Sequence, residues 1–199
     1  MTGDGSVTAS RRDAREGDHV DADQLSGLPA PMNLGLLLLR VVVGVVMFAH
    51  GYNHIFRGGK IAGTGRWFES LGMRPGWLHA WLASLVELGS GVLLVVGLLT
   101  PVAAAGVVGV MLVAWIINHL RNGFFIFRPG EGFEYVMTLF VCGLAIGALG
   151  PGRWSLDHAL DIEFSGWWGF ATTAIGGIGG AALLLLAFWR PPRKEPGAT

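Results

Sequence analysis

Charged residues and cysteine are both scarce in this chain of 199 residues. Charged side chains make up 14% of the sequence, whereas an ordinary soluble domain carries about 25%. This deficit, together with a hydrophobic content of 52%, indicates that lipid surrounds much of the protein. Acidic and basic residues are equal in number, at 14 each, so net charge gives no support for a nucleic-acid partner.

The single cysteine, Cys142, excludes an intramolecular disulfide, a Cys-x-x-Cys redox pair and a thiolate-held cluster. The sequence also lacks a Gly-rich nucleotide loop and a nucleophile elbow. These absences argue against a stand-alone enzyme that acts on soluble substrates. Any redox role must therefore use something other than a thiol relay.

The N-terminal segment is polar. Its first 30 residues contain six acids and three arginines among Gly, Ser and Pro, a composition that cannot bury enough apolar surface to order itself. No apolar stretch follows the basic residues before Pro29 and Pro31, so the segment does not resemble a signal peptide. We predict a disordered tail over residues 1–32.

Five later segments approach the roughly 20 apolar residues that a helix needs to cross a bilayer core of about 30 Å. The fourth is short but adequate, and the fifth carries aromatic residues at both ends and Gly176 and Gly180 at close-packing spacing. The sequence thus predicts an all-α polytopic membrane protein, with a four-helix bundle over 33–160, a fifth transmembrane helix within 161–190 and a cytoplasmic tail over 191–199. The five segments are about 33–56, 76–99, 101–120, 133–149 and 167–189.

Two connections differ in character. Leu99-Thr100-Pro101 joins the second and third segments almost without a loop, which predicts an antiparallel hairpin with Pro101 in the first turn of the third helix. Residues 57–75 are glycine-rich and then amphipathic, a pattern that fits either a short interfacial helix or a plain loop.

Lysine and arginine predict the orientation, because cytoplasmic loops carry an excess of these residues. With five spans, nine basic residues fall on one face and four on the other. This places the N-terminus outside and the C-terminus in the cytoplasm. The nine are Arg57, Lys60, Arg66, Arg74, Arg121, Arg128, Arg190, Arg193 and Lys194, and the four are Arg11, Arg12, Arg15 and Arg153.

Ionisable residues within the spans are candidate functional residues, because a charge inside the bilayer costs several kcal/mol unless it is paired or hydrated. At 100° per residue, Arg40 and His54 share the bundle-facing side of the first helix, and His50 lies about 80° away. Glu87 lies on a stripe of small residues in the second helix. Two further pairs stand at helix ends: Asn118 and His119 close the third helix, and Glu134 and Thr138 open the fourth.

The order of the helices brings these side chains together. Helices one and three end on the face where helices two and four begin, so His50, His54, Asn118, His119 and Glu134 fall in the same half of the membrane. Glu87 lies about 16 Å below that face at 1.5 Å per residue. Arg40 approaches from the opposite side and could reach toward Glu87 by snorkelling. We predict a polar funnel that leads from the cytoplasmic face to a central carboxylate.

Other interpretations of these residues stay open. Arg40 and Glu87 could form only a buried pair that fixes helix register. His50 and His54 could share a metal ion with Glu134 or His119, and the funnel could equally supply the hydrogen-bond donors that a quinone head group needs beside an apolar slot. His54 and His79 could be interfacial, and Asn118 could simply cap its helix.

A set of short motifs, in order and without a large gap over about 33–160, resembles the DoxX family of small bacterial membrane proteins. The first helix ends in the Ala49-His50-Gly51 step that is common in this family. The other matching motifs are Leu36 to Arg40, Val45 to Phe48, Phe68 to Gly72, Leu85 to Gly89, Gly97 to Pro101, Asn122 to Phe125, Gly132 to Tyr135 and Gly150 to Asp157.

The resemblance implies a compact four-helix bundle in the bacterial inner membrane, to which the fifth helix is an addition. Family members are related to membrane subunits of an archaeal thiosulfate:quinone oxidoreductase, and actinobacterial members are linked to oxidoreductase complexes that handle thiol and oxidative stress. The residues carried over are His50, Glu87, His119 and Glu134, which coincide with the predicted funnel.

Two functional hypotheses follow. In the first, the protein belongs to or anchors a membrane oxidoreductase system, with a soluble oxidoreductase as partner and a quinone as ligand. Glu87 would accept a proton, His50 or His119 would bind the quinone carbonyl, and Arg40, His54, Asn118, Glu134 and Thr138 would line the site. In the second, the protein is a scaffold, chaperone or assembly factor whose glycine-dense fifth helix grips a client. Solute transport is a third idea, against which stands the lack of an obvious inverted repeat.

Overall fold

The computed structural model describes residues 29–192, and every regular element in that range is helical apart from one isolated bridge between Met73 and Trp189. The predicted tails over 1–28 and 193–199 lie outside the described residues. The elements are α2 (Ala30–Phe56), α3 (Lys60–Ser70), α4 (Gly76–Val96), α5 (Thr100–Ala114) with the π-helix η1 (Trp115–His119), α6 (Glu134–Leu149), α7 (Leu156–Ala159), and α8 (Gly166–Ala174) with the π-helix η2 (Ile175–Gly179) and α9 (Gly180–Phe188).

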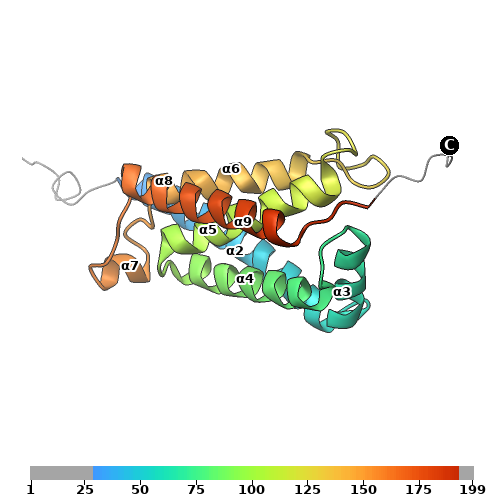
Figure 1. Cartoon of the computed structure of the whole chain (residues 1–199). Helices are drawn as coiled ribbons and strands as arrows, with labels where there is room; N and C mark the ends of the chain where they lie inside the picture. The colour runs from blue at the N-terminus through green and yellow to red at the C-terminus, as the bar shows by residue number, and fades with distance from the viewer. Residues whose placement is uncertain (1–28, 193–199) are drawn as a thin grey trace, which may run out of the picture.

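The long helices run side by side, which confirms the predicted all-α membrane bundle (Figure 1). Four helical runs are long and apolar enough to cross a membrane: 30–56, 76–96, 100–119 and 166–188. The last run is α8, η2 and α9 in continuous succession, called here helix five. α6 is shorter, and its 16 residues span about 24 Å. The bundle therefore has two ends, called here the α3 end and the α7 end after the short helices that lie there (Figure 1).

The connection between α4 and α5 is longer than the sequence predicted, because residues 97–99 lie between the two helices. α4 ends at Val96 because Gly97 adopts a left-handed conformation with φ of 69°. The amide of Leu98 donates to the carbonyl of Leu93 at 2.9 Å, which closes a Schellman-type cap. Pro101 lies in the first turn of α5, as expected. Reading Leu98 and Leu99 as helix was wrong because their hydrophobicity conceals the conformational break at Gly97.

Residues 60–70 form a helix, so the helix alternative for this connection is confirmed and the loop alternative is wrong. The segment that follows α3 also holds the end of helix five. The indole of Trp189 donates to the Leu71 carbonyl at 3.0 Å, and the amide of Arg190 donates to the Gly72 carbonyl at 2.8 Å. These bonds fix the last turn of helix five against the α3 end of the bundle.

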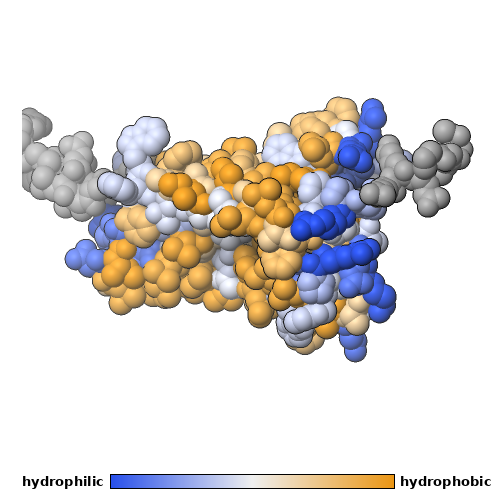
Figure 2. All heavy atoms as spheres, in the orientation of Figure 1, coloured by the Kyte–Doolittle hydropathy of each residue, from blue (hydrophilic) through white to orange (hydrophobic). Residues whose placement is uncertain are grey.

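The distribution of polarity is that of a protein in lipid. Many large apolar side chains on α2, such as Leu38 (55% exposed) and Val42 (60% exposed), face outward, while Arg40 and Glu87 are buried. Figure 2 shows apolar surface over the middle of the bundle and hydrophilic residues gathered toward its ends, above all at the α3 end. The exposed apolar band is the surface that the acyl chains cover.

α2 and α4 pack backbone to backbone. A Cβ added at Gly44 would lie 2.7 Å from the Gly91 carbonyl oxygen, and one added at Gly91 would lie 2.7 Å from the Gly44 oxygen. About two turns nearer the α3 end, a Cβ added at Gly51 would lie 2.8 Å from the Ser84 carbonyl oxygen. Small residues permit this separation because no side chain stands between the helices.

Helix five packs on α5 and α6 and is part of the bundle. The hydroxyl of the fully buried Thr173 donates to the Pro101 carbonyl at 2.9 Å. A Cβ at Gly177 would lie 2.8 Å from the Ala105 carbonyl oxygen, whereas one at Gly180 would meet no heavy atom within 4 Å. The expectation that Gly180 provides a close helix contact is therefore wrong within this chain, and Gly177 takes that role.

The α2–α4 contact predicts the effect of a single methyl group. Gly91→Ala should lower the free energy of unfolding by about 1–3 kcal/mol, because the added Cβ overlaps the Gly44 carbonyl. Gly89→Ala is the matched control: it lies on the same helix, is exposed and has no atom within 4 Å of its added Cβ. Thermal unfolding in detergent should show a loss for Gly91→Ala and no loss for Gly89→Ala. Equal melting temperatures for the two variants would contradict this packing.

Candidate functional site: a cavity with one polar wall

A cavity of about 820 Å³ lies among α2, α4, α5, α6 and helix five. This volume is within the range of roughly 300–1,000 Å³ that small-molecule and cofactor sites occupy. Five of the eight predicted site residues line it: His50, His54, Glu87, Asn118 and His119. The rest of its wall is mostly apolar, with Gly, Ala and Val residues of α5 and helix five. We call the whole space the cavity, and the side built by these five residues with Tyr135 the polar wall.

Glu87 and His54 form the centre of the polar wall. The Glu87 carboxylate is buried, and its Oε2 lies 3.3 Å from His54 Nδ1. This separation fits an ion pair, yet the angles do not make a hydrogen bond, and neither atom has another hydrogen-bond partner among the described residues. Buried polar atoms without partners are rare and costly. Both residues line the cavity, and these two atoms have hydrogen-bonding capacity that the described residues do not use.

The close contact of α2 with α4 creates this pair. Gly51 lets α2 approach the Ser84 carbonyl. The two helices are antiparallel, so His54 and Glu87 stand on opposite sides of this contact along the helix axes, and their side chains, which lean toward the N-terminus of each helix, meet at 3.3 Å. Ser84 itself is satisfied, because its hydroxyl donates to the Ala80 carbonyl at 2.7 Å. The stripe that the sequence predicted on α4 thus faces the bundle, and Glu87 is its one carboxylate.

His50 extends the polar wall toward the surface. Its Nε2 lies 3.3 Å from the hydroxyl of Tyr135, and the two rings stack with their centroids 6.0 Å apart. The sequence interpretation missed Tyr135 because it chose the neighbouring charged residue, Glu134. The sequence did contain a signal for Tyr135: the chain has only two tyrosines, and this one lies in the first turn of a predicted span.

Asn118 and His119 occupy the π-helix η1 that continues α5. A π turn inserts an extra residue per hydrogen-bonded ring and re-aims the side chains that follow, and such turns are frequent at functional sites. Both ring nitrogens of His119 have neighbours: Nδ1 lies 2.9 Å from the Glu131 carbonyl oxygen and Nε2 lies 3.2 Å from the Asn118 amide nitrogen. His119 therefore forms the end of the polar wall near the α3 end, and neither of its ring nitrogens is free to bind a ligand.

Glu134 and Thr138 do not line the cavity, and their predicted place in the funnel is wrong. One Glu134 oxygen accepts a hydrogen bond from the Ile126 amide at 2.9 Å, which holds the loop before α6. The Thr138 hydroxyl donates back to the Glu134 carbonyl at 2.7 Å, one turn earlier in the same helix. The start of α6 is rotated so that Tyr135, and not Glu134, faces the interior.

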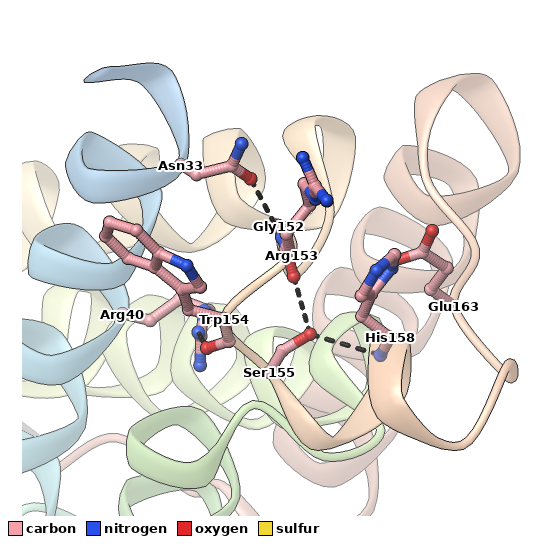
Figure 3. Close-up of polar contacts among 8 residues, drawn as sticks. All are labelled: Asn33, Arg40, Gly152, Arg153, Trp154, Ser155, His158 and Glu163. Atoms are coloured by element: carbon pink, nitrogen blue, oxygen red, sulfur yellow. Dashed lines mark hydrogen bonds and ion pairs between the residues drawn. The ribbon is translucent and has the colours of Figure 1, made fainter. Parts of the chain in front are cut away.

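Arg40 does not reach Glu87, so the predicted pairing of these residues is wrong. Its guanidinium is fully buried and points toward the α7 end, where it donates to the carbonyls of Leu94 at 2.8 Å and Trp154 at 2.7 Å (Figure 3). The Leu94 carbonyl belongs to the last turn of α4, where a positive charge is favourable. Arg40 thus joins α2 to the end of α4 and to the loop before α7.

Asp157 completes this second polar cluster. Its two carboxylate oxygens accept hydrogen bonds from the amides of Leu99, at 2.6 Å, and Thr100, at 2.9 Å. A carboxylate in this place satisfies amides that the start of a helix leaves unpaired. Nearby, Asn33 accepts a bond from the Arg153 amide at 2.8 Å (Figure 3). We call Arg40, Asp157 and the carbonyls and amides that they hold the structural clasp.

The arrangement does not fit the metal hypothesis. Within residues 29–192, no group of three or more His, Cys, Asp or Glu side chains is placed to hold a metal ion. Glu134 and His119, the proposed additional ligands, bond to loop backbone instead.

His79 is a further candidate that sequence reasoning assigned to the interface. It is 2% exposed, lines the cavity and packs between the rings of Phe68 and Phe188. The backbone of Arg74 interacts with the His79 ring, yet neither ring nitrogen makes a hydrogen bond of good geometry within the described part of the chain. Its burial depends on α3 and on the end of helix five, whose positions the sequence pattern of α4 alone does not reveal.

Comparison with known proteins gives matches to membrane proteins. Residues 35–120 match the sequence profile of the DoxX family. The chain is 32% identical over 138 residues to the uncharacterized membrane protein Rv3486 of Mycobacterium tuberculosis, an alignment that covers 63% of this chain and 81% of that protein. No solved structure gives a significant match.

Two further relatives cover similar shares. The inner membrane protein YqjF of Escherichia coli is 27% identical over 135 residues, which are 66% of this chain and 96% of that protein. CatD of Bacillus subtilis, a protein provisionally named an oxidoreductase, is 32% identical over 113 residues, which are 57% of this chain and 78% of that protein.

The structural clasp predicts a graded loss of stability at Asp157. Asp157→Ala should lower the free energy of unfolding by about 2 kcal/mol, because the amides of Leu99 and Thr100, the second of them buried, lose their acceptor. Asp157→Asn keeps one acceptor oxygen and should lose less. In thermal unfolding in detergent, the melting temperature should be highest for the wild type, lower for Asp157→Asn and lowest for Asp157→Ala. An unchanged melting temperature for Asp157→Ala would refute this role of the structural clasp.

His79→Phe tests whether the histidine is retained for the fold. The substitution removes two unsatisfied nitrogens and keeps the aromatic contacts with Phe68 and Phe188, so the melting temperature should stay the same or rise. A fall of several degrees would show that the imidazole stabilises the fold and would remove the basis for a functional role.

Proposed function

Because the chain is a member of the DoxX family of membrane proteins, we propose that it is a component of a membrane-associated oxidoreductase system and that its cavity binds the head group of a quinone. The observation that carries this proposal is that Glu87 and His54 line a largely apolar cavity while two of their buried atoms, Glu87 Oε2 and His54 Nδ1, have no hydrogen-bond partner among the described residues. A ring with carbonyl or hydroxyl oxygens and an otherwise apolar body complements such a wall.

The polar wall offers a route for protons. The Glu87 carboxylate would accept a proton from a hydroxyl of the bound ring. His54, whose Nδ1 lies 3.3 Å from Glu87 Oε2, would then take this proton from Glu87. His50 lies one turn earlier on α2, is exposed and has its Nε2 3.3 Å from the Tyr135 hydroxyl, so His50 and Tyr135 would connect the pair of Glu87 and His54 with water. A bound quinone supplies the two-electron, two-proton chemistry, and these residues supply the hydrogen bonds and the proton path.

His50 suits contact with a ring carbonyl better than His119 does. His119 is engaged at both ring nitrogens, by Asn118 and by the Glu131 carbonyl. His50 has one neighbour, Tyr135 Oη, at 3.3 Å, a separation long enough to rearrange when a ligand enters. Of the two alternatives that the sequence left open, we therefore propose His50.

The α3 end is the face that we propose for a soluble oxidoreductase partner. Among the described residues it carries Arg57, Lys60, Arg66, Arg74, Arg121, Arg128 and Arg190, whereas the α7 end carries Arg153. By the positive-inside rule this face is cytoplasmic, with the protein in the inner membrane and its C-terminus in the cytoplasm. The proton path and the electron donor would then meet the same compartment. The provisional naming of the relative CatD as an oxidoreductase is in keeping with this proposal.

Glu87→Gln tests the proposed function. Protein purified gently from its native membrane should yield quinone on solvent extraction, and the variant should retain at least tenfold less, since loss of a bond to a charged group costs about 1.5–3 kcal/mol. Glu134→Gln is the matched control, because that carboxyl lies outside the cavity and should leave retention unchanged.

Two outcomes would contradict the proposal. One is quinone retention by Glu87→Gln equal to that of the wild type. The other is wild-type protein that contains no quinone and co-purifies with a stoichiometric client protein. That second result would favour the scaffold or assembly-factor hypothesis.

A further inference from the structure

The apolar part of the cavity reaches the surface between α4 and helix five. Leu82 on α4 and Gly176 and Gly180 on helix five line the cavity and are themselves exposed. Leu82 is six residues from the start of α4 and Gly180 eight residues from the end of helix five, so both lie about 9–12 Å inside the α3 end. The opening is therefore at the depth of acyl chains and not at the aqueous face.

The surroundings of this opening are apolar. Leu85 (59% exposed) on α4 and Leu183 and Leu186 (71% and 78% exposed) on helix five present apolar side chains at the surface of these two helices. Glycine leaves space at this opening, because even a Cβ added at Gly180 would meet no heavy atom within 4 Å. Helix five cannot swing across it freely, because Trp189 and Arg190 hold its end to the segment after α3.

His79 lies where this apolar part meets the α3 end. It is nine-tenths or more buried and lines the cavity, and apart from the nearby Arg74 backbone its two ring nitrogens have no hydrogen-bond partner of good geometry among the described residues. A purely apolar channel wall does not need an imidazole. A polar group that passes or rests there would satisfy it.

We propose that the opening between α4 and helix five is a lateral access route from the bilayer, and that the apolar part of the cavity holds the tail of a lipid-tailed molecule whose polar head reaches Glu87 and His54. His79 hydrogen-bonds the head during passage. The inference rests on the proposed function for the nature of the head and adds the tail, the direction of access and a role for helix five. The occupant is a molecule with a long apolar chain, because the cavity joins a polar wall to an opening onto lipid.

The test compares two probes with the same head. One is the tailless ring 2,3-dimethoxy-5-methyl-1,4-benzoquinone, and the other is its decyl derivative. Each is bound to the full chain in lipid nanodiscs, followed by quenching of tryptophan fluorescence, with affinity expressed per mole of lipid so that partitioning cancels. Wild type should bind the decyl probe at least tenfold more tightly than the tailless ring.

Gly180→Leu and Gly179→Leu form a matched pair of variants. An added Cβ at either position meets no atom within 4 Å, so both should fold, but only Gly180 lines the cavity. Gly180→Leu should weaken the decyl probe about tenfold and leave the tailless ring within twofold. Gly179→Leu should change neither, and both variants should keep the wild-type melting temperature.

The outcomes separate this inference from the proposed function. If the wild type binds both probes equally, or if Gly180→Leu leaves the decyl affinity unchanged, the access route is refuted while head binding at Glu87 can stand. If the wild type binds neither probe, the proposed function and this inference fail together. A change of oligomeric state in Gly180→Leu, seen by light scattering in detergent, would make the opening a protein interface and would also overturn the inference.

Discussion

The close contact of α2 with α4 is the constraint on which the rest of the structure depends. At Gly44, Gly51 and Gly91 the two backbones approach so nearly that a single added carbon would overlap a carbonyl oxygen. This separation excludes lipid between the helices and brings His54 to 3.3 Å from Glu87. A carboxylate in the bilayer is tolerated only in such a setting, since exposure to acyl chains would leave its charge without a partner. The contact of His54 with Glu87 at the centre of the polar wall thus depends on three glycines.

The buried polar groups fall into two sets with different chemistry. At the α7 end, Arg40 and Asp157 bind backbone groups of α4, α5 and the loop before α7 through four hydrogen bonds, although Arg40 Nε and Thr100 Oγ1 lack a hydrogen-bond partner among the described residues. At the other side, Glu87, His54 and His79 have buried atoms without partners and face a cavity. A satisfied network stabilises a fold, whereas unsatisfied atoms around a space are a cost that the fold alone does not explain. The second set differs in that its residues line the cavity, and this difference supports the proposal that the second set serves function and the first serves structure.

Hydrophobic length predicted the helices well, because a bilayer span requires a long uninterrupted apolar segment and because Pro101 marks a helix start. The facing of Glu87 also followed from the sequence, since small residues share its side of α4. The direction of long side chains did not follow from the sequence. The Arg40 side chain could extend toward Glu87 or toward the α7 end, and the position of the loop around Trp154 decides between the two. The π turn at 115–119 has no signal in composition, and the rotation of α6 that selects Tyr135 over Glu134 depends on loop contacts. The burial of His79 required knowing where helix five ends.

An experimental density map of the protein, purified in its native lipids at a resolution that shows side chains, tests the central claim most directly. The account predicts an elongated density in the cavity, with its head within hydrogen-bond distance of Glu87 and His54 and its tail leading between α4 and helix five. A map in which Glu87 faces acyl chains, or in which side chains fill the space between α4 and helix five, would contradict it.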